Sequence, residues 1–159
     1  DPDTTNLTLV QKGSVEIELE WSYTEVSDND HGDMPVDMIS RGIKTCVIRV
    51  PVTDHDLATI RAMLPLASYF SANGTRVEPR PNIGASLLTY AKELVLKKFV
   101  LGSATTDETL WITAPKAVPT GIFKMSLGNE QSVYTVEFRC FPDTTKNNRP
   151  IYFGDEAAS

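Results

Sequence analysis

The chain has 159 residues, of which 41% are hydrophobic and 23% charged, and its formal net charge is −6. This is the composition of an ordinary globular domain, and it excludes collagen-like, low-complexity and wholly disordered chains, so we expect one domain over residues 1–159. No apolar run approaches the roughly 20 residues of a membrane-spanning helix, and we expect no secretion signal because no basic segment precedes an apolar one.

The charge is distributed unevenly along the chain. Residues 1–56 hold 12 acidic and 4 basic side chains, net −8, whereas residues 57–159 carry a net charge of +2. Proteins that bind nucleic acid through its phosphates concentrate basic side chains on one face. The distribution therefore disfavours attraction of DNA, although it permits DNA to pass along an acidic wall.

The first clear element is a strand over residues 14–23, where polar and apolar side chains alternate with a period of two. The alternation predicts a buried face that consists of Val15, Ile17, Leu19, Trp21 and Tyr23. It also predicts a solvent face that carries three carboxylates in a row, those of Glu16, Glu18 and Glu20.

A second strand is predicted over residues 43–50, with Cys46, Ile48 and Val50 facing the core. Pro51 should end it, because proline cannot donate a hydrogen bond to a neighbouring strand. With no oxidising compartment indicated, we expect Cys46 and Cys140 to be reduced, buried thiols.

A single helix is predicted after this strand. Thr53 is a candidate N-cap with an acidic residue three positions later, and Asp54 and Asp56 suit the positive end of the helix dipole. An apolar stripe of Leu57, Ile60, Met63 and Leu64 follows at helical spacing. Pro65 should stop the helix.

The rest of the chain has the pattern of β-structure. The predicted strands cover residues 93–100, 109–114, 122–127, 133–141 and 151–153, with a turn at 128–130 and a C-terminal loop and tail over 143–159. One helix among several antiparallel strands favours a mainly β fold, a sandwich-like β-barrel with one flanking α-helix.

The connection between the first two strands, residues 24–42, is longer than the roughly 12–15 residues at which structureless loops become uncommon. We therefore expect a long inter-strand loop with a function. It carries acidic and polar side chains at Asp28, Asp30, His31, Asp33 and Asp37. It also carries apolar side chains with no obvious partner in their own subunit, at Met34, Val36, Met38 and Ile39.

The sequence contains no pattern that indicates catalysis or a cofactor. Neither histidine lies in a nucleophile motif, no glycine-rich phosphate loop is present, and no spacing of cysteine and histidine suits zinc. Residues 28–33 resemble a calcium loop in composition, but Ile39 stands where an EF-hand needs glutamate. We expect no enzyme, cofactor or metal. The alternative is a monomeric β-sandwich binding module that uses residues 28–37 to hold calcium or a carbohydrate, and an uncharacterised hydrolase is a third possibility.

At residues 23–37, YTEVSDNDHGDMPVD, the sequence resembles a phage major tail protein. The resemblance continues in order through the strand at 46–50 and the helix entry at 51–57. It then covers ASLLTYAKELVL at 85–96, APKAVPTG at 114–121 and YTVEFRCFPD at 134–143, which leads to residues 153–155. It spans nearly the whole chain, and the order of the segments carries it.

The resemblance implies a structural subunit of the tail tube of a long-tailed phage, located in the virion tail and assembled in the cytoplasm of the bacterial host. In such proteins six subunits close into a ring, and rings stack around a channel that conducts DNA without binding it sequence-specifically. The family also implies a tape-measure protein and a tail terminator as partners, and no membrane.

Residue roles follow as expectations. Glu16, Glu18 and Glu20 should line the lumen. The loop residues Asp28, Asp30, His31, Asp33, Met34, Val36, Asp37 and Met38 should contact the neighbouring ring. Arg76 and Arg80, in the polar stretch 71–81, are the candidate basic partners of the loop aspartates.

Overall fold

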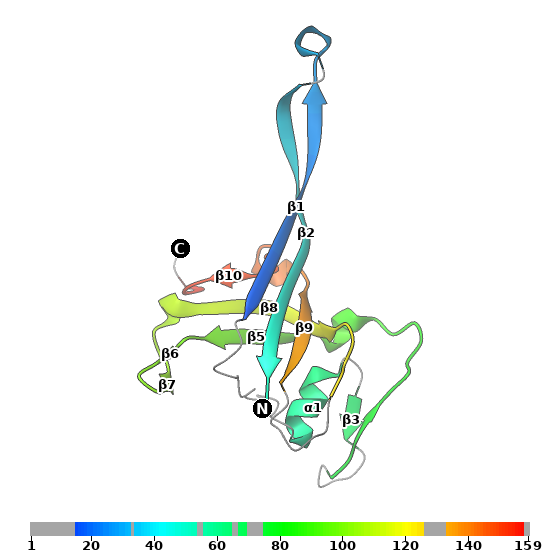
Figure 1. The fold of residues 1–159 in the computed structure, drawn as a ribbon, viewed down its shortest axis with the longest axis vertical. Helices are drawn as coiled ribbons and strands as arrows, with labels where there is room; N and C mark the ends of the chain where they lie inside the picture. Colours follow the sequence, from blue (N-terminus) through cyan, green and yellow to red (C-terminus); the bar gives the residue numbers. More distant parts are fainter. Residues whose placement is uncertain are drawn as a thin grey trace.

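A computed structural model describes residues 15–32, 34–53, 56–64, 67–69, 75–125 and 133–157. Strands dominate it and one α-helix is present among these residues, so the mainly β fold with a single helix is confirmed (Figure 1). The strands are β1 (Glu16–Ser27), β2 (Pro35–Val52), β3 (Ala67–Tyr69), β4 (Val77–Pro79), β5 (Lys92–Lys97), β6 (Phe99–Val100), β7 (Ser103–Ala104), β8 (Trp111–Thr120), β9 (Tyr134–Cys140) and β10 (Tyr152–Phe153). The helices are α1 (Leu57–Met63) and the 3-10 turns η1 (Asn29–His31), η2 (Leu87–Tyr90), η3 (Glu108–Leu110) and η4 (Thr144–Lys146).

Six strands form one antiparallel sheet in the order β1-β2-β9-β8-β10, with β5 on the other side of β8. The sheet curls into a half-barrel. Within the described part of the chain, β1, β5 and β10 are edge strands, since β1 pairs only with β2, and β5 and β10 pair only with β8. The pairs β3–β4 and β6–β7 form two separate small sheets. None of the described helices is long and apolar enough to cross a lipid bilayer.

The core lies under β2 and β9, where the alternation predicted from Cys46 to Val50 and from Tyr134 to Cys140 is confirmed. The expectation that Pro51 ends the strand is wrong, because β2 continues through Pro51 to Val52, paired to β9. From Cys46 to Val52 in β2 and along β9, every second side chain points into one buried cluster. This cluster also contains Met63 of α1 and Ala114 and Ala117 of β8. The buried members from the two strands are Cys46, Ile48, Val50, Val52, Tyr134, Val136, Phe138 and Cys140. Val15, Ile17 and Leu19 pack against this cluster as the sequence predicts.

The helix starts three residues later than the expected cap. Asp56, not Thr53, is the N-cap of α1, and its carboxylate accepts a hydrogen bond of 2.9 Å from the backbone N–H of Thr59. The pKa of Asp56 is lowered, first by a hydrogen bond from the Thr59 side chain and then by this backbone bond. Met63 is buried, but Leu57 is 39% exposed and so is not part of the buried stripe. Asp54, His55 and Pro65 lie outside the described residues.

Strand β8 runs ten residues, through Pro115 and Pro119, whereas the sequence predicted a strand over 109–114. Pro115 falls at the register shift opposite β5, and Pro119 lies past the last β5 pair, so neither has to donate to a continuous ladder on both sides. The predicted strand at 93–100 is divided into β5 and β6 at Lys98. Residues 122–125 are not a strand, and residues 126–132, with the expected turn, lie outside the described residues.

The predicted C-terminal loop is held against the sheet. The Asp143 carboxylate accepts hydrogen bonds from the N–H and hydroxyl of Thr145, at 3.0 and 2.8 Å, and lies 3.1 Å from Lys116 Nζ. These contacts lower the pKa of Asp143, chiefly through Thr145. The short closing strand is confirmed as β10, which pairs with β8.

The largest departure from the sequence analysis is the connection 24–42, which is not a loop. Strand β1 continues to Ser27 and β2 begins at Pro35, so these residues form the outer half of a β-hairpin that projects from the sheet (Figure 1). The register shifts at Glu20/Trp21, Ser22/Tyr23 and Val26/Ser27. Each such bulge increases the twist of the ribbon. Gly42, with φ +95°, lies beside the second shift, in a conformation that favours glycine.

The two ends of β2 should respond differently to the same substitution. Ile48 is fully buried and Ile39, on the projecting half, is 56% exposed. We expect Ile48→Ala to lower the free energy of unfolding by about 2–5 kcal/mol, because it leaves a cavity. Ile39→Ala, the matched control, should change it by no more than about 0.5 kcal/mol. Urea denaturation of both variants measures this, and equal losses would contradict the assignment of the core.

Candidate functional site

The projecting hairpin carries many of the exposed large apolar side chains of the described chain. We call residues 21–43 the arm, residues 28–34 its tip, and the segments 16–20 and 44–49 its root. Eight large apolar side chains of the arm are exposed: Trp21, Tyr23, Val26, Met34, Val36, Met38, Ile39 and Ile43. Soluble monomers rarely keep so many apolar side chains together on one protruding element, so this surface has the character of an interface.

Trp21 and Tyr23 correct the sequence analysis, which placed both on the buried face. The predicted alternation holds from Glu16 to Leu19 and then fails at the register shift between Glu20 and Trp21. Beyond that shift the ribbon leaves the sheet, so no core lies beneath either face. The two aromatic rings therefore belong to the arm surface.

The tip is a tight turn, and aspartates in it and beside it accept hydrogen bonds from nearby backbone N–H groups. The Asp28 carboxylate caps η1 by accepting a hydrogen bond from the N–H of Asp30, at 3.3 Å. Gly32 ends the turn with φ +66°. The Asp37 carboxylate accepts a hydrogen bond of 2.7 Å from the N–H of Met38. His31 ends η1, and Asp33 lies outside the described residues.

The arm tip and the start of β2 are strongly acidic. The sequence from 28 to 37 contains four aspartates and neither lysine nor arginine. Met34, 76% exposed, and the exposed Val36 stand among these charges. A complementary surface therefore combines basic groups with an apolar pocket.

The glutamate row lies at the root, on the outer side of the sheet, and is partly neutralised. Arg49 Nη1 lies 2.7 Å from Glu18 Oε2, and Arg49 Nε lies 3.2 Å from Glu137 Oε2. Lys44 Nζ lies 2.9 Å from Glu20 Oε1. The sequence alone suggested a bare acidic stripe, because the register that brings the two cations across from β2 is a tertiary feature.

These ion pairs shift the pKa values of Glu20 and Arg49. The pKa of Glu20 is lowered, mainly by the hydrogen bond and the charge of Lys44, with a further hydrogen bond from the hydroxyl of Thr45. The pKa of Arg49 is raised, first by its hydrogen bond to Glu18. Glu20 and Arg49 are therefore charged at neutral pH.

The two arginines expected to contact the loop aspartates flank β4, Arg76 before it and Arg80 after it. Arg76 Nε is 2.9 Å from Glu78 Oε1 of the same chain, so a contact with an aspartate of another subunit would compete with this ion pair. Arg80 directly follows β4 and is exposed. Both remain predictions as interface residues.

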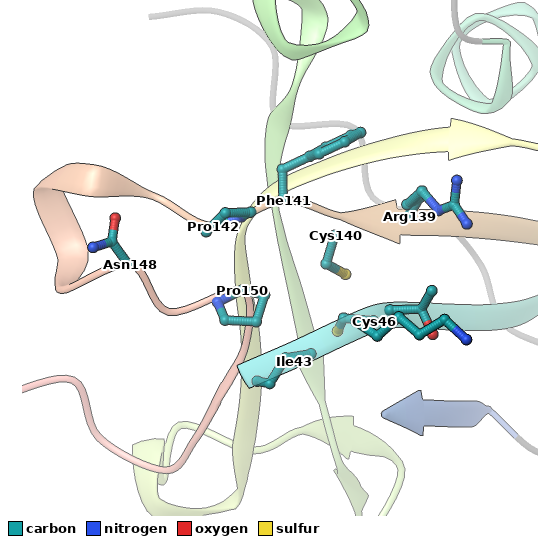
Figure 2. A pocket seen from close by; sticks show the side chains of 10 residues that line it. Ile43, Cys46, Arg139, Cys140, Phe141, Pro142, Asn148 and Pro150 are labelled. Carbon is teal, nitrogen blue, oxygen red and sulfur yellow. The ribbon is translucent and has the colours of Figure 1, made fainter. Parts of the chain in front are cut away.

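A cavity of about 500 Å³ lies beside the root, between the middle of β2 and the end of β9 (Figure 2). Cys46 and Cys140 line it together with Ile43, Arg139 and Phe141. Both thiols are free and buried. The sequence predicts two buried thiols but not their contact, because 93 residues lie between them in the chain.

Among the described residues, no group of three or more histidine, cysteine, aspartate or glutamate side chains is arranged to hold a metal ion. The chemistry that these residues bring together is that of an interface: apolar side chains, paired charges and an acidic tip. The hairpin itself had a local signal, because Val36 and Met38 alternate with Asp37 after a glycine-containing turn.

Comparison with protein-family models, with curated proteins and with solved structures found no match.

The ion pair at the root makes a titration prediction. In Lys44→Gln, we expect the pKa of Glu20 to rise toward its ordinary value of 4.5, as the cause of its lowering is removed. A group whose pKa is lowered by folding stabilises the folded state above its unfolded pKa, and this contribution is lost as the pH falls through the folded value. NMR titration of the side-chain carboxyl carbons measures the shift. Arg41→Gln, on the arm, is the control, and an unchanged Glu20 midpoint in Lys44→Gln would contradict the pair.

Proposed function

We propose that the chain is a non-enzymatic structural subunit that assembles with copies of itself into a tail tube of a long-tailed phage or a phage-derived particle. Six copies close into a ring, and rings stack through the arm into a hollow tube that conducts DNA. A tape-measure protein and a tail terminator complete the assembly. The observation that carries the proposal is the arm, a twisted hairpin with eight exposed apolar side chains that projects from a half-barrel.

The arm supports stacking because a two-stranded ribbon is marginally stable alone in water. Covering an apolar side chain contributes roughly 1.5–3 kcal/mol when burial is complete. Packing Met34, Val36 and Met38 against a neighbouring subunit would therefore stabilise both the contact and the ribbon. The acidic tip adds selectivity for a basic surface.

The sheet edges support ring closure. Within the described residues, β1 and β5 each pair with a single strand and lie at opposite sides of the sheet. In the proposed ring, β1 of one copy contacts β5 of the next, and this contact is heterologous because the two strands differ. Such a heterologous contact generates a ring when its rotation closes.

The root supports a channel wall over which DNA slides. Glu16, Glu18 and Glu20 face away from the core, and Arg49 and Lys44 hold two of them in place. We propose that this row lines the lumen. Phosphates would meet a wall that has fixed carboxylates and whose cations are already paired, so DNA would have little to bind.

The alternative of a calcium or carbohydrate module has no comparable support. The carboxylates of Asp28 and Asp37 accept hydrogen bonds from backbone N–H groups within the arm, which is the ordinary role of aspartate in a turn.

Charge on the arm should abolish assembly without unfolding the subunit. We expect Met38→Glu to remain folded by circular dichroism, because Met38 is exposed, and to stay as monomers or single rings. The wild type should form rings and tubes in negative-stain images and in light scattering. Ile83→Glu places the same charge at a fully exposed isoleucine outside the arm, and it should assemble normally.

Two results would contradict this. Tubes of normal length from Met38→Glu would exclude the arm as the stacking element, and the stacking contact would then have to lie on the sheet edges. A wild-type protein that stays monomeric at every concentration and binds calcium would overturn the tube altogether.

Reversing the root charges should make the channel hold DNA. In tubes of the triple variant Glu16→Lys, Glu18→Lys and Glu20→Lys, we expect double-stranded DNA fragments to be retained and protected from nuclease, since lysines within about 8 Å of the phosphates attract them at physiological salt. High salt should release the DNA. Replacement of the three by glutamine, the matched control, removes charge without adding cations and should retain much less. Retained DNA that nuclease still digests would place the row on the outside of the tube.

A further inference from the structure

We propose that Cys46 and Cys140 form a redox-active pair that a peroxide-class oxidant converts into a cross-strand disulfide, locking the arm to the sheet. The proposal is independent of tail tube function. It rests on the position of the two thiols at the end of the β2–β9 ladder and on the cavity that reaches them.

The register places the two cysteines opposite each other. The ladder between β2 and β9 ends at the pair Val47↔Arg139, so the next residue on each strand is a cysteine. Facing residues of antiparallel strands have Cα atoms about 4.5–5.5 Å apart, within the roughly 4.4–6.8 Å range of disulfides. Figure 2 shows the two sulfur atoms turned toward the same gap between the strands.

The thiols already interact. A hydrogen bond between them lowers the pKa of Cys46 and raises the pKa of Cys140, and burial of Cys140 raises the latter further. Cys46 is therefore the thiol that ionises first, with Cys140 as the donor to its thiolate. Such an asymmetric pair has the attacking and the resolving sulfur that disulfide formation requires.

The oxidation balances with one peroxide molecule. The Cys46 thiolate attacks a peroxide oxygen, the O–O bond breaks, and a sulfenic acid forms on Cys46 with release of water after protonation. The Cys140 sulfur then attacks the Cys46 sulfur, the S–O bond breaks, and hydroxide leaves as water with the proton of Cys140. Two thiols and one hydrogen peroxide give one disulfide and two waters.

The site gives this bond a structural consequence. At Cys46, strand β2 leaves β9 and continues into the arm with β1 as its only described strand partner, paired there to Leu19. The disulfide links β2 to β9 at the point where the two strands separate, which we call the fork at Cys46. It restrains the direction in which the arm projects.

The full-length protein is reduced, freed of reductant and treated with about one equivalent of hydrogen peroxide while folded. We expect the intact mass to fall by two hydrogens, peptide mapping to give a 46–140 linkage, and the melting temperature to rise by roughly 5–15 °C, because a long loop is closed. Since the sequence contains only these two cysteines, any disulfide within one chain joins them.

A second probe tests proximity without oxidation. Phenylarsine oxide bridges two thiols that lie close together, and we expect one equivalent to bind the folded wild type. Cys140→Ala, which keeps Cys46, should bind none and should form no intramolecular disulfide. If this variant does not fold, the wild-type mass and mapping decide alone.

Three results would overturn the proposal: oxygen adducts on separate thiols, disulfide-linked dimers as the main product, or a folded protein whose thiols resist peroxide while the unfolded chain reacts.

Discussion

The structure depends on the antiparallel pairing of β2 with two different neighbours along its length. From Val47 to Val52 the strand is paired to β9 and is largely buried, whereas from Pro35 to Cys46 it is paired to β1 alone. The buried half supplies the free energy that holds the strand in place, since each core side chain there contributes roughly 1.5–3 kcal/mol. The outer half could not keep its register in isolation. The arm is therefore a ribbon whose conformation is imposed from its root.

The charges follow the same division. At the root, Lys44 and Arg49 of β2 form ion pairs with carboxylates of β1 and β9, so the positive charges of this surface are paired. At the tip and the start of β2, residues 28–37 hold four aspartates and neither lysine nor arginine, so the sequence there carries a net negative charge. The two regions are suited to different tasks: the root to a smooth, non-adhesive surface, and the tip to a contact with a basic partner.

The fork at Cys46 joins these regions mechanically. Hydrogen bonding between β2 and β9 ends there, the buried cluster ends there, and the cavity opens there. Any change in the angle of the arm relative to the sheet must be accommodated at this point, because the sheet on one side is packed and the ribbon on the other is not. A covalent bond between the two thiols at that position would restrain the direction of the arm.

The sequence by itself determined the elements whose burial follows a simple period. The inward faces of residues 46–50 and 134–140, the outward glutamates of 16–20 and the helix at 57–63 were all predictable, since each repeats over several residues against one core. Only the tertiary structure decided where that core ends. Trp21 and Tyr23 continue the apolar alternation but lie beyond the edge of the sheet, so they are exposed, and the expected loop at 24–42 is a hairpin because strand pairing can continue without a core beneath it. The contacts of Glu20 with Lys44 and of Cys46 with Cys140 were likewise hidden, because they depend on the register between strands. The pattern within one strand shows which face is buried, but it does not show which residue of the neighbouring strand lies opposite.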